Sequence, residues 1–103
     1  MTKATIDSFR RRIDELDTEL VTLLSERATC ALGIGRIKET SGQAVYQPGR
    51  EADVLARVRA SNPGPLDDRA ITRLFERIID EARRLERQVH AETGGRADET
   101  TER

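Results

Sequence analysis

One apolar stripe near the N-terminus constrains this chain more than any other feature of its sequence. Ten positions, spaced three or four residues apart, fall on one side of a helix, and nine of the ten are apolar. They are Ile6, Phe9, Ile13, Leu16, Leu20, Leu23, Arg27, Cys30, Ile34 and Ile37. The spacing predicts one helix from about residue 6 to about residue 40, ended by Ser41-Gly42.

A helix of this length exceeds what the rest of the chain can cover. At 1.5 Å per residue it measures roughly 50 Å, whereas a compact monomer of about 100 residues has a radius of gyration of only about 13 Å. Because a small domain buries little of its surface alone, we expect a second copy of the chain to cover part of the stripe. The sequence therefore predicts a homodimer with intertwined helices.

Two further helices are predicted downstream. A short one covers about residues 49–60, with Pro48 suited to its first turn, and a medium one runs from Asp67 or Asp68 to about residue 90. No segment has the alternating pattern of a strand. The predicted fold class is therefore all-α, with one long, one short and one medium helix per chain.

The last stretch differs in composition from the helices before it. Residues 91–103 are polar, include Gly94-Gly95 and carry no apolar period. Such segments cannot bury enough apolar surface to offset their loss of conformational entropy. We therefore expect a helical domain over residues 1–90 and a disordered tail over 91–103.

The composition excludes several classes of function. The net charge is −1 with both signs interspersed, so nothing favours a nucleic-acid partner. The single cysteine, Cys30, allows neither an intramolecular disulfide nor a metal cluster, and we expect it to be a buried thiol. Neither a signal peptide nor a long apolar run is present in the sequence, so we expect a cytoplasmic protein that does not enter a membrane.

Several charges lie on or beside the apolar faces, where an unpaired charge is costly. Each alone is explained by an ordinary position at a helix edge or end. Together they could line a cavity with more cations than carboxylates, and they are Arg10, Arg27, Lys38, Arg50, Glu51 and Glu86. Arginine binds carboxylates through two parallel hydrogen bonds, so the predicted ligand is a small polyanion.

The same set contains no convincing nucleophile or general base. His90, the only histidine, lies beside the polar tail, and we expect it at the surface. No glycine-rich phosphate loop and no set of metal ligands is present in the sequence. A site of this kind fits ligand binding, or a reaction that needs only positioning and electrostatic stabilisation, with no cofactor.

Several short segments, taken in order, identify a family. They are Arg10–Asp17, Leu23–Arg27, Ile34–Lys38, Gln47–Glu51, Ile71–Phe75 and Ile78-Ile79. In this order and spacing, across about residues 6 to 90, they resemble the all-α chorismate mutases, which convert chorismate to prephenate by a Claisen rearrangement. The resemblance implies a three-helix chain in an intertwined homodimer, in agreement with the length argument.

The resemblance also implies roles for individual residues. Arg10, donated by the partner chain, and Arg27 would hold the two substrate carboxylates, and Arg50 would also face the substrate. Lys38 would contact a carboxylate and the ether oxygen, and Glu51 would accept a hydrogen bond from the substituent on ring carbon 4. Gln47 and Ala82 match binding positions at which a well-known member has Asp and Ser, so we expect them to contribute less here.

Glu86 is the departure with the greatest consequence. The family often has Gln at this position, where it donates a hydrogen bond to the breaking ether bond. A carboxylate donates only when it is protonated. We therefore expect Glu86 to act as a neutral acid, and we count it with Lys38 and Arg27 as a catalytic residue.

Three other functions remain open at the level of sequence. The first is the same rearrangement of 4-amino-4-deoxychorismate in antibiotic biosynthesis, since an amine on carbon 4 would also suit Glu51. The second is an isochorismate pyruvate lyase of the same fold. The third is a helical dimerisation or regulatory module without catalytic activity.

Overall fold

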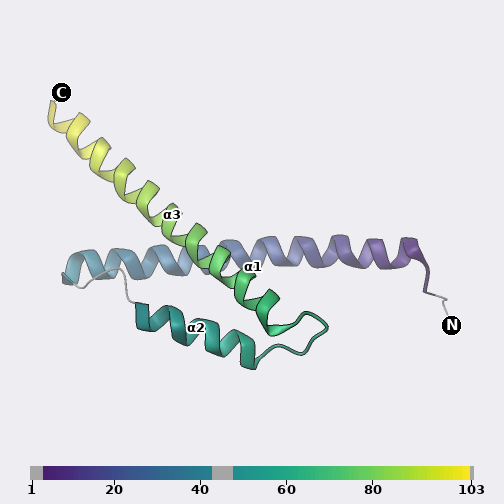
Figure 1. The fold of residues 1–103 in the computed structure, drawn as a ribbon. Coiled ribbons are helices and arrows are strands. Elements are labelled where there is room, and N and C mark those ends of the chain that lie inside the picture. The colour runs from purple at the N-terminus through teal and green to yellow at the C-terminus, as the bar shows by residue number, and fades with distance from the viewer. Residues whose placement is uncertain (1–3, 43–47, 103) are drawn as a thin grey trace.

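The computed structural model describes residues 4–42 and 48–102, and within them the side chains of residues 4–42 and 49–92. The described chain forms three helices, α1 (Ile6–Ser41), α2 (Pro48–Ala60) and α3 (Asp68–Glu102) (Figure 1). The predicted all-α class and the order of a long, a short and a third helix are confirmed. None of the helices in the described ranges has an apolar stretch that could span a membrane.

Local hydrogen bonds define both ends of α1. At the start, Oγ1 of Thr5 accepts from the Ser8 amide (3.0 Å), and Oγ of Ser8 accepts from the Thr5 amide (2.8 Å). At the other end, Gly42 adopts a left-handed conformation (φ 75°), and its amide donates to the carbonyl of Lys38. The predicted bounds of this helix are confirmed to within one residue.

The turn between α2 and α3 is organised by Asn62. Its Nδ2 donates to the Leu66 carbonyl (2.7 Å) and to Oδ1 of Asp68 (3.0 Å), and its Oδ1 accepts from the Gly64 amide (3.0 Å). The first turn of α3 is capped by Oδ1 of Asp67, which accepts from the Ala70 amide (2.7 Å). These bonds bring the chain back so that α3 packs against α2 and also crosses α1 (Figure 1).

The end of α3 differs from the prediction. The helix does not stop near residue 90 but continues to Glu102, so that α3 is nearly as long as α1. Glycine inside a helix costs about 1 kcal/mol relative to alanine, so Gly94-Gly95 weakens the helix without ending it. The division into a domain over residues 1–90 and a disordered tail over 91–103 stays a prediction about the chain in solution.

The single chain is extended and has no buried core in the described residues. Its radius of gyration is 18.8 Å and its dimensions are 67 × 33 × 17 Å. The N-terminal part of α1 projects away from both other helices (Figure 1), and its apolar stripe is open to solvent, with Ile6 70% and Phe9 62% exposed. The accessible surface is 8703 Å², against about 5,800 Å² for a compact monomer of 11.6 kDa.

Candidate active site

The crossing of α3 over α1, with α2 alongside, brings most of the predicted site residues into one region. Five of them are half-buried, in a structure whose described side chains are mostly exposed. They are Arg27 and Lys38 on α1, Glu51 on α2, and Ala82 and Glu86 on α3. Because these residues come from three different helices, only the packing of the helices can bring them together.

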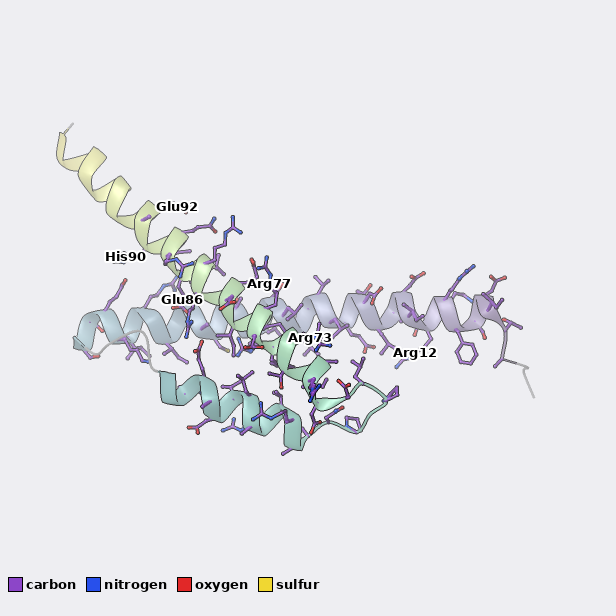
Figure 2. All side chains as sticks on the ribbon, in the orientation of Figure 1. Arg12, Arg73, Arg77, Glu86, His90 and Glu92 are labelled. Carbon is purple, nitrogen blue, oxygen red and sulfur yellow. The ribbon has the colours of Figure 1, made fainter. Side chains whose placement is uncertain are left out.

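Glu86 lies where α3 passes over α1 (Figure 2). A Cβ built on Gly35 of α1 would be 3.9 Å from Oε2 of Glu86, so the carboxyl group lies directly over this glycine. Residues three apart on a helix share a face, which places Lys38 one turn further along α1 on the side of Gly35. The crossing therefore places the Glu86 carboxyl over the part of α1 that carries Lys38.

Three of the half-buried charges are not paired within the described part of the chain. Among the side chains that the structure describes, Arg27, Lys38 and Glu86 form no ion pair. Partial burial removes some hydration from a charge, and the cost is recovered when an oppositely charged group or a hydrogen-bond partner approaches. A bound ligand with carboxylates would supply such partners to the two cations.

A groove of about 560 Å³ runs between α1 and α3, within the range of sites for small ligands. Arg27 and Ala82 contribute to its wall, together with the cations Arg77 and Arg84. Lys38, Glu51 and Glu86 are not among its lining residues. In the single chain, the groove and the group of predicted site residues thus overlap at Arg27 and Ala82.

The structure also brings in a residue that the sequence analysis missed. The guanidinium of Arg83 on α3 forms an ion pair with Oε1 of Glu51 on α2, and the two side chains are 31% and 27% exposed. In an arginine-rich sequence, Arg83-Arg84 reads as surface charge. The sequence did offer a signal, because Arg83 follows the apolar residues Phe75 and Ile79 at a spacing of four and so falls on their face of the helix. In the structure all three are half-buried.

Two predicted site residues are not brought into this region in the single chain, and a third is not described. Arg10 is exposed on the projecting part of α1, and Arg50 is exposed in the first turn of α2. Gln47 lies outside the described residues. The distance along α1 from Arg10 to Arg27 is about 26 Å, far more than an arginine side chain can span.

The described residues offer no alternative site based on a metal or on a buried thiol. No group of three or more His, Cys, Asp or Glu side chains in the described part of the chain could hold a metal ion. Cys30 is exposed, so the expectation of a buried thiol is wrong for the single chain. The reason is that α3 crosses this stretch of α1 over another face of the helix, the one that carries Ala28 and Gly35. His90 is exposed as predicted, and its Nδ1 lies 2.5 Å from Oε1 of Glu39 on α1.

Comparison with known proteins places this arrangement in a family. The family model described as chorismate mutase type II matches residues 9–87. The solved structure of chorismate mutase (form II) from Thermus thermophilus superposes with a TM-score of 0.77 and 38% identity, over 80% of this chain and 93% of that one.

Two curated relatives are similar over comparable stretches. The bifunctional chorismate mutase/prephenate dehydratase of Neisseria gonorrhoeae is 45% identical over 80 residues, which are 78% of this chain but only 22% of that protein. The chain thus spans less than a quarter of the length of this bifunctional relative. The chorismate mutase of Methanocaldococcus jannaschii is 28% identical over 85 residues, and the match covers 86% of its length.

The contact between Arg83 and Glu51 can be measured through stability. For an ion pair whose side chains are less than one-third exposed, a double-mutant cycle with Glu51→Gln and Arg83→Gln should give a coupling of about 0.5–1 kcal/mol in the free energy of unfolding. Urea denaturation at one fixed protein concentration provides the measurement. Arg87, exposed on the same helix, is the control: Glu51→Gln combined with Arg87→Gln should be additive. A coupling of zero at Arg83 would contradict the contact.

Proposed function

The chain belongs to the type II chorismate mutase family, and from this premise we propose that it catalyses the rearrangement of chorismate to prephenate. The observation that carries the proposal is the group of half-buried Arg27, Lys38 and Glu86 at the crossing of α1 and α3, none of them ion-paired within the described residues. Such a group is suited to a ligand with two carboxylates and an ether oxygen.

The reaction matches the chemistry that these residues can supply. A Claisen rearrangement is unimolecular: one C–O bond breaks while one C–C bond forms, and no covalent intermediate with the enzyme is needed. The protein must hold the reactive chair-like conformer and stabilise the negative charge that develops on the ether oxygen. In our proposal Arg27 binds one substrate carboxylate, and its two parallel N–H donors restrict the conformers of the bound substrate.

Lys38 and Glu86 act on the departing oxygen in this mechanism. The position of the Glu86 carboxyl over Gly35, one helical turn from Lys38, supports placing both groups at one substrate atom. Their interactions with the oxygen strengthen as its charge grows, which lowers the barrier and raises kcat. Glu86 must be protonated for this, since an ionised carboxylate would repel the developing charge.

The remaining predicted residues bind and orient the substrate. Glu51 accepts a hydrogen bond from the group on ring carbon 4, and Arg50, one residue earlier at the start of α2, adds a cation near a carboxylate. Gln47 and Ala82 offer weaker contacts, because neither side chain here provides the carboxylate or hydroxyl that the resemblance associates with their positions. No cofactor enters the mechanism.

We further propose that the active protein is an intertwined homodimer in which Arg10 enters the partner's site. Two features of the single chain support this. The apolar stripe of α1 is exposed, and contact of so much apolar surface with water is unfavourable. Obligate homodimers commonly bury about 2,000–5,000 Å² of surface in their interface. Arg10 also lies about 26 Å along the helix from Arg27, so it can help bind the same substrate only from another chain.

The role of Lys38 is tested by comparison with Gln47. Lys38→Ala should lower kcat by roughly 100-fold, because one preorganised donor to the developing charge contributes on the order of 3 kcal/mol. Gln47→Ala should change kcat and KM only slightly. Prephenate formation, followed by loss of chorismate absorbance, gives both constants. Equal effects of the two substitutions would contradict the assignment of Lys38.

The role of Glu86 predicts a particular dependence on pH. Since the protonated acid is the active form in this mechanism, kcat/KM should be highest at low pH and fall as the pH rises. Glu86→Gln keeps an N–H donor at all pH values, so its profile should be flat. A flat profile for the wild-type protein between about pH 5 and 9 would contradict the requirement for a neutral acid.

Donation of Arg10 between chains can be tested by mixing two inactive variants. Arg10→Ala and Lys38→Ala homodimers each lack one essential group in both sites. After subunit exchange, half of the dimers are mixed, and each of these has one intact site, so about a quarter of wild-type activity should return. Without exchange between chains, or with Arg10 acting in its own chain, activity would stay at the level of the separate variants. Sedimentation of the mixture confirms the dimeric state.

A further inference from the structure

We propose that Arg83 makes this site select a hydroxyl over an amine on ring carbon 4 of the substrate. The inference rests on the proposed function, in which Glu51 binds the group on that carbon. Its observation is the ion pair between the Arg83 guanidinium on α3 and Oε1 of Glu51 on α2, with both side chains mainly shielded from solvent. Arg83 acts through Glu51 and is a positioning residue that determines specificity.

The ion pair leaves Glu51 able to bind a hydroxyl. A carboxylate has two oxygens and about four lone-pair positions, and the contact with Arg83 is made through Oε1. The other positions can still accept a hydrogen bond from a neutral O–H group. A hydroxyl needs only an acceptor, so the charge of Arg83 does not oppose its binding.

An amine meets a different electrostatic environment. On a saturated ring carbon it is an ammonium at neutral pH, and its binding is favoured by a nearby net negative charge. Beside Arg83, the charge of Glu51 is already balanced, and the guanidinium repels a second cation at short range. Glu51 without Arg83 would attract the ammonium. With Arg83 in place, the pair is an acceptor without net charge.

Partial burial strengthens this distinction. Charges that are exposed on both sides are screened by water and salt, and their effect on a ligand is small. Glu51 and Arg83 are 27% and 31% exposed, and a substrate seated against them would remove more of the remaining water. Repulsion between the guanidinium and an ammonium is therefore screened less than it would be at the protein surface.

The experiment compares kcat/KM for chorismate and for 4-amino-4-deoxychorismate at pH 7. The variants are Arg83→Gln and Arg83→Met, which remove the charge, and Arg83→Lys, which keeps it. Arg87→Gln is the matched control, because Arg87 is exposed on the same helix one turn further on. The readout is the ratio of the two kcat/KM values, which a general loss of stability would lower for both substrates alike.

The wild-type protein should prefer chorismate, and the neutral Arg83 variants should lower this preference by about tenfold or more. Arg83→Lys should keep it to within about threefold, since a cation remains near Glu51. Arg87→Gln should leave it unchanged. An unchanged ratio in both neutral variants would overturn the role of Arg83 while leaving the proposed function intact. Wild-type preference for the amine would overturn the role of Arg83 and favour 4-amino-4-deoxychorismate as the substrate. Turnover of neither substrate by the wild-type protein would instead overturn the proposed function.

Discussion

The mismatch between α1 and the rest of the chain is the constraint on which the other features depend. The helix has 36 residues, and within the described part of the chain only α3 contacts it, so that most of its apolar stripe remains in solvent. A chain of this size could have folded into a short three-helix bundle with a core of its own. Its apolar surface lies instead along one long helix. The described residues accordingly contain no buried side chain, although α1 is capped at both ends.

The same geometry separates two functions along one helix. The C-terminal part of α1 carries Arg27, Gly35 and Lys38 beneath α3, where the charges become half-buried. The N-terminal part carries Arg10 on the projecting segment. In the proposed dimer this segment would cross to the partner. The same association would then cover the exposed stripe and complete the set of cations in the site. Stability and substrate binding would then depend on the same contact.

Electrostatic balance within the site explains why its charges are not interchangeable. Arg27, Lys38 and Glu86 have no ion-pair partner among the described residues, so their interactions remain available to a ligand. Glu51 differs, because Arg83 already contacts it. In the proposed mechanism the two glutamates therefore have different roles, Glu86 as a donor at the ether oxygen and Glu51 as an acceptor whose charge is balanced by Arg83.

Much of the fold and part of the site could be predicted before the structure. The three- and four-residue spacing of the apolar residues predicted α1, and Thr5 and Gly42 are capping residues whose chemistry acts within one turn. The end of α3 could not be placed, because Gly94-Gly95 disfavours a helix by an amount that continuous neighbouring turns can offset. Cys30 was expected to be buried because it lies in the apolar stripe, but it is exposed. The spacing of apolar residues shows which face of a helix is apolar, and it does not show what covers that face.

The sequence by itself determined the helices, their apolar faces and the charged residues that interrupt those faces, because these are local properties repeated at the period of one helix. Only the tertiary structure decided which charges meet. The placement of Glu86 over Gly35 and the pairing of Arg83 with Glu51 depend on how α3 crosses α1 and packs on α2. Contacts between helices are set by packing over many residues, and no spacing along one helix encodes them.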